Sequence, residues 1–460
     1  MWKALSRSGP GNGTERLFLM LTSVKTANIF HIYCEECDLK IGNFLDWHRN
    51  KQICPGCGTN HVSVQYHRDY GDLRHLIRNG SALNSMWRYH PFLPITNIAN
   101  IVSSGEGAVA IERWKFLEKL AERRGIQCQV YAHRHDNNPS TGTFKDLAGS
   151  VIGSVLRENA VPNYVVASTG NIGVAMSRYL AAAGVGLSVF IPQSSPRLHD
   201  AEMGCFGQKV FRVIGDYAKA KEMAGQFAAD NGYLLSPGGY DPIRVEAKKT
   251  IFFEWLRVLG ECPTVYIQAL SGGMGPLGIA KGIRELEGQD LFDKPPRFYL
   301  VQSDRCAPMA QAWEKAKNNG FPEGWENDYP IIENPQTEIA TLATGRPGLY
   351  PLVGKLVNQT DGEIVSFRED LTIDVARIVA FEVGVRIGPA AAIAVGGFFE
   401  ALKRGDLRTG DVVMIAIGEG MRRAPDFMMK MAWSSEVSSS SQCSPADRSE
   451  YATQIWSRIE

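Results

Sequence analysis

Short apolar runs alternate with longer segments of helical periodicity from about residue 127 onward. The periodicity predicts helices at residues 144–158, 171–183, 217–231, 244–259, 276–286, 371–382 and 390–404. Strand-like apolar runs occupy residues 128–132, 164–167, 187–191, 210–214, 264–268, 298–301 and 412–417. Continuous apolar strands that alternate with helices are typical of parallel sheets with helices on both faces. The number of units predicts two such sheets, with functional residues in the loops that follow the strands.

Two pairs of cysteines near the N-terminus have the spacing of a metal site. Cys34 and Cys37 form one Cys-x-x-Cys motif, and Cys54 and Cys57 form another after sixteen intervening residues. Two such knuckles turn four thiolates toward one point, which predicts a tetrathiolate zinc ribbon. Since sulfur fills all four positions, we expect this zinc to be structural, and the ribbon to act as a clamp or interface element. Four ordinary buried cysteines are the alternative interpretation.

The composition limits the possible partners. Basic and acidic side chains number 49 each, and hydrophobic residues make up 44% of the 460-residue chain. We therefore expect neither nucleic acid nor an anionic membrane surface as a partner. No apolar run reaches the roughly 18 residues of a membrane-spanning helix, and the N-terminus is a poor signal peptide. Together with five scattered cysteines that suit reduced thiols, these features predict a cytoplasmic protein.

One lysine stands at the junction between a turn-forming loop and a predicted helix. Residues 137–146 read Asn-Asn-Pro-Ser-Thr-Gly-Thr-Phe-Lys-Asp, and a run of small and apolar residues follows directly. Lys145 can face a cavity from this position. Burial would then lower the pKa of the amine and make it a competent nucleophile and base. A solvated surface lysine is the alternative interpretation.

Two loops at predicted strand-to-helix junctions have the composition of anion sites. The first combines small hydroxyl, glycine and amide residues, namely Ser168, Thr169, Gly170 and Asn171. Its free backbone N–H groups suit a carboxylate, although simple helix capping is the alternative. The second is glycine-rich and contains Gly272, Gly273, Met274 and Gly275. Its backbone can approach a phosphate closely, although a plain turn is the alternative. A reactive lysine with a phosphate loop is what a Schiff-base cofactor needs, and pyridoxal phosphate is the candidate.

The order and wording of these motifs resemble the fold type II pyridoxal-phosphate enzymes, which are tryptophan synthase β-like. Within that group the chain is similar to the threonine synthase and cysteate synthase branch, and most to cysteate synthase, over roughly residues 30–430. The resemblance implies that Lys145 forms the Schiff base and moves the α proton. It implies that Asn171 hydrogen-bonds the phenolic oxygen of the cofactor, and that residues 272–275 surround the phosphate. Ser168, Thr169 and Gly170 would bind the substrate carboxylate.

Ile417 departs from the family pattern. The family places a Ser or Thr there to hydrogen-bond the pyridine nitrogen, so Glu419 becomes the alternative partner for this atom. The lysine loop also has one extra residue, Ser140 or Thr141, relative to threonine synthases, and it is a candidate determinant of substrate choice. The basic side chains near the candidate loops are Arg88, His133, Arg134, His135, Arg244 and Arg346. Arg346 is the preferred substrate-binding residue, because its turn-rich loop can reach inward.

The resemblance implies an α/β protein with two doubly wound, parallel-sheet domains and an N-terminal zinc ribbon. The ribbon spans residues 30–62, the larger cofactor-binding domain residues 63–139 and 239–430, and a smaller mobile domain residues 140–238. Residues 1–29 and 431–460 are expected to be flexible tails.

The activity implied by the resemblance is β-replacement on a small amino acid by a small nucleophile. O-phosphoserine and sulfite would give cysteate and phosphate through an aminoacrylate, and the enzyme would be a homodimer. The alternatives are threonine synthesis from O-phosphohomoserine and another β-replacement reaction that makes a non-protein amino acid. A catalytically silent zinc-ribbon scaffold is a more remote alternative.

Overall fold

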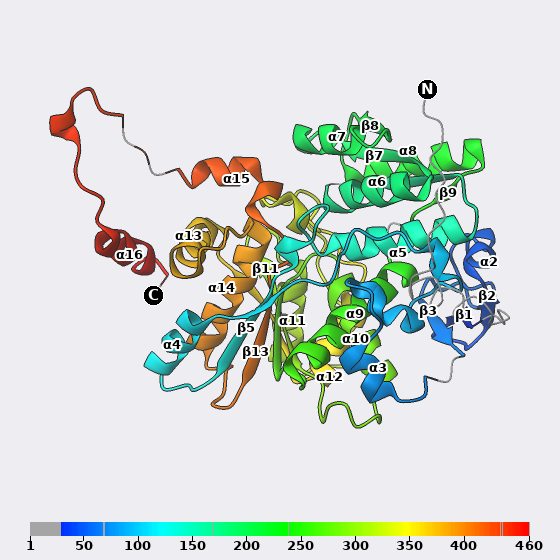
Figure 1. Cartoon of the computed structure of the whole chain (residues 1–460), viewed down its shortest axis with the longest axis horizontal. Helices are drawn as coiled ribbons and strands as arrows, with labels where there is room; N and C mark the ends of the chain where they lie inside the picture. Colours follow the sequence, from blue (N-terminus) through cyan, green and yellow to red (C-terminus); the bar gives the residue numbers. More distant parts are fainter. Residues whose placement is uncertain are drawn as a thin grey trace, which may run out of the picture.

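Three sheets organise the chain. The computed structural model describes residues 29–67, 70–168, 170–237, 239–432, 434 and 436–459. A six-stranded sheet has the order β12-β11-β10-β13-β5-β4, a four-stranded sheet the order β8-β7-β6-β9, and a three-stranded sheet the order β2-β1-β3. The two larger sheets lie in separate α/β layers, with the small sheet at their side (Figure 1). The prediction of an α/β fold with two parallel sheets is confirmed.

The larger sheet is parallel except at β4, which pairs antiparallel with β5. Its strands are β4 (Ile111–Arg113), β5 (Gln129–His133), β10 (Val265–Ala269), β11 (Arg297–Ser303), β12 (Glu363–Phe367) and β13 (Val412–Ala416). One face is covered by α9 (Pro242–Leu259), α10 (Met274–Leu286), α11 (Pro308–Asn318) and α12 (Tyr350–Gln359). The other face is covered by α4 (Lys115–Arg123), α13 (Thr372–Val383) and α14 (Pro389–Arg404).

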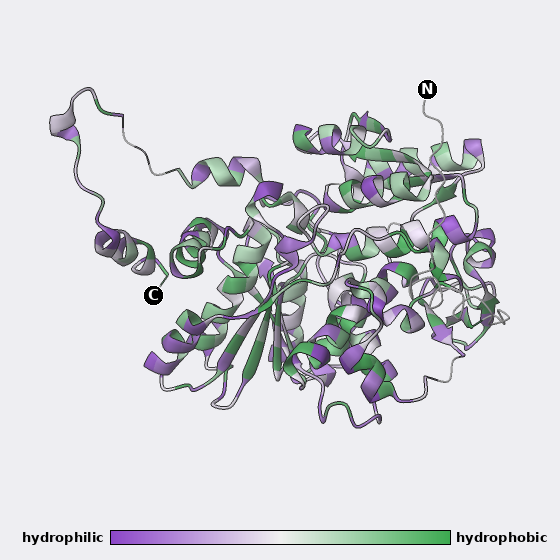
Figure 2. Ribbon diagram, in the orientation of Figure 1, coloured by the Kyte–Doolittle hydropathy of each residue, from purple (hydrophilic) through white to green (hydrophobic). Residues whose placement is uncertain are grey.

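Successive residues of the central strands enter two different cores. In β10, Tyr266 packs with the first set of helices, whereas Val265 and Ile267 pack with the second set. Because side chains alternate across a strand, a strand covered on both faces is apolar at most positions. Figure 2 shows these strands as hydrophobic along their length. This double burial explains why unbroken apolar runs predicted them.

The smaller sheet is wholly parallel and contains β6 (Asn163–Ala167), β7 (Gly186–Pro192), β8 (Lys209–Val213) and β9 (Leu234–Leu235). Helix α8 (Tyr217–Asn231) packs on one face through its alanines. The other face packs on α5 (Lys145–Glu158) and α6 (Asn171–Ala183), and α7 (Arg197–Gly204) lies next to α6. Helix α5 also packs on α9, which joins the two parallel-sheet units. The predicted mobility of this part stays a prediction.

The ribbon comprises β1 (Phe30–Cys34), β2 (Lys40–Gly42), α2 (Phe44–Arg49) and β3 (Val62–Tyr66). Its strands pair antiparallel, and α2 begins with a reciprocal capping box between Asn43 and Asp46. The hydroxyl of Tyr66 donates to Glu246 on α9 over 2.7 Å. The short helix α3 (Leu73–Asn79) follows and also packs on α9. The ribbon is therefore attached to the larger unit.

The predicted C-terminal tail, residues 431–460, contains the helix α16 (Arg448–Trp456), and α15 (Pro425–Lys430) ends directly before residue 431. Figure 1 shows α16 beside α13, at the end of an extended segment. Ile455 is buried, the Trp456 ring lies 6.2 Å from the Phe399 ring, and Arg458 pairs with Asp374 over 3.2 Å. Of the predicted N-terminal tail, residues 1–28 lie outside the described residues. Within the described ranges, no helix is long and apolar enough to cross a bilayer.

Candidate active site

Residues 137–146 form a tight loop around one buried carboxylate. Asp146 accepts hydrogen bonds from the backbone N–H groups of Ser140 over 3.0 Å and Thr141 over 2.9 Å. The Thr141 hydroxyl donates to the same side chain over 2.6 Å. Burial raises the pKa of Asp146 to about 6, although these hydrogen bonds oppose the shift. Ser140 and Thr141 thus close the loop, and neither lines the cavity described below.

The loop is joined to the segment that follows β13. The N–H of Phe144 donates to the carbonyl oxygen of Gly418 over 3.2 Å, and the N–H of Gly420 donates to that of Gly142 over 3.1 Å. Gly142 has a φ of 66°, and an added Cβ would lie 2.6 Å from the Arg422 guanidinium. Only glycine meets both requirements. These contacts fix the position of the lysine that follows.

Lys145 is the first residue of α5 and lines a cavity of about 480 Å³. The cavity lies at the C-terminal ends of strands from both parallel sheets, where ligands bind in such folds. Burial lowers the pKa of Lys145 to about 8, and the positive charge of Arg244 acts in the same direction. The negative charge of Glu419 opposes the shift. A larger share of this amine is therefore neutral at physiological pH than for an exposed lysine.

Residues 272–275 form a glycine-rich turn that lines the same cavity at the start of α10. Gly273 is the N-cap residue with a φ of 92°, and no side chain caps the helix. An added Cβ would lie 2.5 Å from a methyl group of Val353 at Gly273, and 2.5 Å from the Gln268 amide at Gly275. The turn therefore needs glycine for steric reasons, and it leaves helix N–H groups available to a phosphate.

Asn171 and Glu419 form a polar wall of the cavity. The Asn171 amide donates to Glu419 Oε2 over 3.0 Å, and its carbonyl oxygen accepts from Arg423 Nε over 3.0 Å. Glu419 Oε1 accepts from the N–H of Ala390 over 3.0 Å. Burial raises the pKa of Glu419, whereas its hydrogen bonds and the nearby Arg423 and Lys145 oppose the shift. The structure thus brings together the lysine, the glycine turn, Asn171 and Glu419.

Residues 104–418 match the model of a family described as pyridoxal-phosphate dependent enzyme. The chain belongs to this family. Threonine synthase of Methanocaldococcus jannaschii is 29% identical over 343 residues, which cover 73% of this chain and 80% of that protein. Cysteate synthase of Methanococcoides burtonii is 27% identical over 385 residues, which cover 80% of this chain and 89% of that protein.

Solved structures share the fold at low sequence identity. Threonine deaminase isoform 2 of Solanum lycopersicum superimposes with a TM-score of 0.58 at 16% identity, covering 75% of this chain and 92% of that one. Cysteine synthase of Entamoeba histolytica superimposes with a TM-score of 0.56 at 16% identity, covering 79% of this chain and 95% of that one. The protein is therefore a fold type II pyridoxal-phosphate enzyme of the threonine synthase and cysteate synthase branch. The resemblance to this branch that the motifs indicated is confirmed, and the closer likeness to cysteate synthase stays a prediction.

The residues of this enzyme fit pyridoxal phosphate. The glycine turn matches the cofactor's phosphate, the Lys145 amine matches its aldehyde, and Asn171 and Glu419 match the polar edge of its ring. His135 also lines the cavity, and both of its ring nitrogens are buried without a hydrogen-bond partner within the described residues. A cavity that combines unsatisfied polar atoms with a free helix N-terminus is suited to a polar ligand.

The remaining residues predicted for the cofactor and the substrate carboxylate do not all reach the cavity. The Ser168 hydroxyl accepts hydrogen bonds from the N–H groups of Gly170 over 3.1 Å and Gly173 over 3.0 Å, so it caps the start of α6. Gly170 itself lines the cavity, and Thr169 lies outside the described residues. The Ile417 side chain is fully buried in the apolar core on the α13 and α14 side of the sheet, away from the cavity lining.

The basic residues of the cavity differ from the preferred prediction. Arg346 borders the cavity, but its side chain is 67% exposed and pairs with Glu333 over 2.7 Å. Arg244 is buried in the first turn of α9, where its Nε lies 3.0 Å from Asp241. One turn later, the buried Lys248 donates to the Arg244 carbonyl oxygen over 3.0 Å. Burial and the charges of two neighbouring cations lower the pKa of Lys248 well below its ordinary value.

Sequence reasoning considered Arg244 but did not select it, and it missed Lys248. A usable signal was present, because Asp241 and Pro242 mark a helix start and place Arg244 in the first turn. The sequence did not indicate that the start of α9 lies close to Lys145 in the folded chain.

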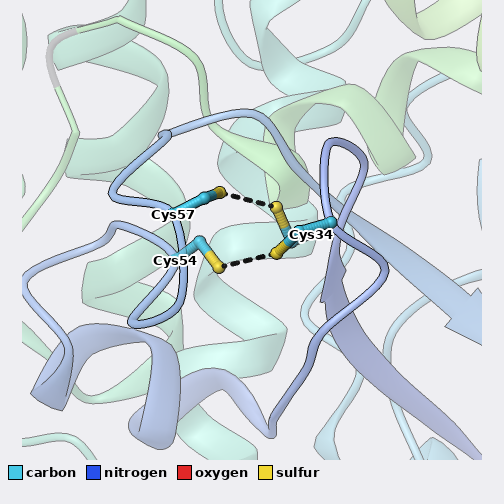
Figure 3. Close-up of side chains that lie close together, drawn as sticks. Cys34, Cys54 and Cys57 are labelled. Atoms are coloured by element: carbon cyan, nitrogen blue, oxygen red, sulfur yellow. Dashed lines mark hydrogen bonds between the residues drawn. The ribbon is translucent and has the colours of Figure 1, made fainter.

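The four cysteines of the two knuckles gather at one point of the ribbon. Their sulfur atoms all lie within 4.8 Å of one another. Cys34 and Cys57 are 3.5 Å apart, and Cys37 and Cys54 are 3.6 Å apart. Figure 3 shows Cys34, Cys54 and Cys57 pointing toward one another. Four convergent thiols can hold a metal ion, in agreement with the predicted ligand set.

Proposed function

We propose that this enzyme replaces the phosphate of an O-phosphorylated amino acid, with O-phosphoserine and sulfite as substrates, as in a cysteate synthase. The observation that carries the proposal is the charge of the cavity. Among the described residues, one acidic side chain, Glu419, and five basic side chains line it. The basic residues are Lys145, Lys221, Arg244, Lys248 and Arg346.

These basic side chains outnumber those that the cofactor requires, and Arg244 is the buried guanidinium among them, whereas burial lowers the pKa of Lys145 and Lys248. The glycine turn suits the cofactor's phosphate. Arg244 pairs with Asp241 through Nε and donates to Ser236 through Nη2, and its remaining N–H donors are available to a second anion. A buried guanidinium binds phosphate or sulfonate more strongly than a neutral side chain, because its hydrogen bonds to anions are charge-assisted. A substrate that carries both a carboxylate and a phosphate uses this charge, whereas an amino acid with a neutral side chain does not.

Bound pyridoxal phosphate supplies an electron sink for the bond that breaks at Cα. The Nζ atom of Lys145 accepts the α proton, for which its lowered pKa is suited. The phosphate leaves with the electron pair of the Cβ–O bond, and Arg244 stabilises its charge. Sulfite then forms a C–S bond at Cβ, and Lys145 returns a proton to Cα. These steps conserve atoms and charge without an added oxidant or reductant.

Threonine synthesis is the second candidate, because a relative named threonine synthase is 29% identical to this chain. O-phosphohomoserine carries the same two anionic groups, so the cavity charge suits it as well. Phosphate release is measured with each compound separately, and the amino-acid products are identified by mass spectrometry. The identity of the product distinguishes the two candidates. Cysteate from O-phosphoserine and sulfite supports the first, and threonine from O-phosphohomoserine supports the second. Absence of phosphate release from either compound contradicts both.

We also infer that the four convergent cysteines hold one structural zinc ion, which would make the ribbon a metal-dependent unit. Metal analysis of purified protein tests this inference. One zinc per chain, lost in Cys54→Ser, supports it, and metal-free wild-type protein with a folded ribbon contradicts it.

A further inference from the structure

The ribbon contributes directly to the wall of the active-site cavity. Asn60 and His61, which follow the second cysteine knuckle, line the same cavity as Lys145 and Arg244. A ribbon that acts only as a clamp does not need to place side chains there. Asn60 and His61 are therefore candidates for contact with a ligand in the cavity.

His61 is held in place by the first knuckle. Its carbonyl oxygen accepts a hydrogen bond from the N–H of Glu35 over 3.1 Å, and its Nδ1 lies 3.2 Å from the Glu36 carboxylate. Glu35 and Glu36 are the two residues between Cys34 and Cys37. Both the backbone and the side chain of His61 are thus positioned by a segment whose ends are predicted metal ligands.

The second knuckle holds the other side of the same loop. The N–H of Cys54 donates to the carbonyl oxygen of Thr59 over 2.7 Å, and the Thr59 hydroxyl accepts from the N–H of His61 over 3.2 Å. A metal ion that ties the two knuckles together would therefore fix residues 59–61 from both directions.

His61 lies beside the start of the helix that carries Arg244. Its ring is 6.1 Å from the ring of Tyr240, which also lines the cavity and directly precedes Asp241. With Nδ1 engaged by Glu36, Nε2 is the ring nitrogen left for a ligand, and in the imidazolium form it donates to an anion. The His61 side chain is 23% exposed and lines the cavity, so the residue is accessible to a ligand without being fully solvated.

The ribbon also bridges the two parallel-sheet units near this cavity. The Gln52 amide donates to the carbonyl oxygen of Leu235 in the smaller sheet. On the other side, Nζ of Lys281 on α10 donates to the carbonyl oxygen of Val64 over 2.9 Å. The position of residues 59–61 is consequently set relative to both units.

We propose that His61 is a specificity-determining residue of the active site, which the metal-held knuckles present to the side-chain phosphate of the substrate. Asn60 assists by a neutral hydrogen bond, and Glu36 is a positioning residue that acts through His61. This inference rests on the proposed function, since it names the phosphate of that substrate. It assigns to the ribbon a role in substrate recognition that a structural clamp lacks.

The test compares His61→Ala with the wild-type holoenzyme. Calorimetry with inorganic phosphate and with O-phosphoserine measures affinity, and metal analysis and the visible absorbance of the bound cofactor report on the ribbon and the cofactor. We expect affinity for both anions to fall about tenfold, as for loss of one charge-assisted hydrogen bond. Zinc content and cofactor absorbance should stay at wild-type values. His75→Ala, at an exposed histidine of α3, is the matched control and should change none of these quantities.

Glu36→Gln provides a second test that does not remove the ring. It should weaken phosphate binding and raise KM by about threefold with little change in kcat, because it only loosens the position of His61. Wild-type affinities in both His61→Ala and Glu36→Gln overturn the inference. Failure of the proposed function looks different, since wild-type enzyme would then bind phosphate but release none from either phosphorylated amino acid.

Discussion

Two regions of one cavity suit anions, and they are built from different parts of the chain. The glycine turn at residues 272–275 offers backbone N–H groups at a helix start. The cationic wall, defined as Arg244 and Lys248, offers buried side chains from α9. Backbone donors are available only where glycine permits the turn, and they suit any phosphate. Side chains can change without altering the fold, so the cationic wall is the region that can select the substrate.

This difference predicts that the two regions separate cofactor binding from substrate binding. Substitutions in the glycine turn should affect the cofactor first. Substitutions in the cationic wall should affect the phosphorylated substrate while the cofactor stays bound. Four predictions, from the largest expected effect to the smallest, test this separation.

Gly273→Ala should give the largest effect, a loss of cofactor affinity of about 100-fold. The new methyl group would lie 2.5 Å from Val353 at a φ of 92°. Overpacking and backbone strain together cost about 3 kcal/mol, and relieving them displaces the phosphate donors. Titration of apoenzyme with pyridoxal phosphate, followed by visible absorbance, measures the affinity.

Gly410→Ala is a matched control for the glycine turn. Gly410 has the same φ of 92°, but an added Cβ would meet no atom within 4 Å. It should lower stability through backbone strain alone and leave cofactor affinity within about twofold of wild type. Equal cofactor affinity in the two variants would show that the turn does not form the phosphate cradle.

Arg244→Gln should give the next largest effect, a rise of about 30-fold in KM for the phosphorylated substrate. It removes a buried charge that would hydrogen-bond an anion, which is worth about 2 kcal/mol. Steady-state kinetics measure KM, and cofactor titration should stay within about twofold of wild type. Arg244→Lys should recover part of the loss, because it keeps the charge but not the fork of donors. A parallel loss of cofactor affinity in Arg244→Gln would merge the two regions into one site.

Much of this site was accessible from the sequence because its signals are local. Lys145, Asn171 and residues 272–275 occupy junctions between strand and helix, where periodicity and glycine spacing mark the positions. The central strands of the larger sheet were also predictable from the sequence, because burial on both faces gives them nearly continuous apolar runs. Strand β12, with a serine exposed in mid-strand, and helices α7, α11 and α12 had weaker patterns and were not predicted.

The remaining residues depend on long-range packing that no local pattern encodes. Arg244 and His61 reach the cavity only because α9 and the ribbon pack around it. The role of Ser168 was also not evident from the sequence, because its hydroxyl accepts hydrogen bonds from backbone N–H groups at the start of α6 and so caps that helix. Ile417 was selected by family position, but strand alternation directs its side chain into the core.

The third prediction concerns the lysine that both anion regions surround. The rate of cofactor incorporation into apoenzyme should rise with pH around a midpoint of about 8, because only the neutral amine of Lys145 reacts. Burial lowers this pKa most, and the charge of Arg244 lowers it further. Arg244→Gln should therefore move the midpoint to higher pH. Stopped-flow absorbance from about pH 6.5 to about 11.5, a range that includes both the lowered and the ordinary pKa of a lysine, would check both statements. A midpoint near the ordinary 10.5 of a lysine would contradict the burial of this amine.

Arg346→Gln should give the smallest effect, a change in KM of less than about twofold at physiological salt. Arg346 borders the cavity, but its exposed guanidinium already pairs with the exposed Glu333. Solvent and salt screen such a pair, so its loss changes binding little. The same kinetic assay as for Arg244→Gln applies, and Glu333→Gln serves as the control that frees Arg346 without removing it. If Arg346→Gln raises KM as much as Arg244→Gln does, then the 344–348 loop moves inward when substrate binds, and the cationic wall includes a residue from that loop.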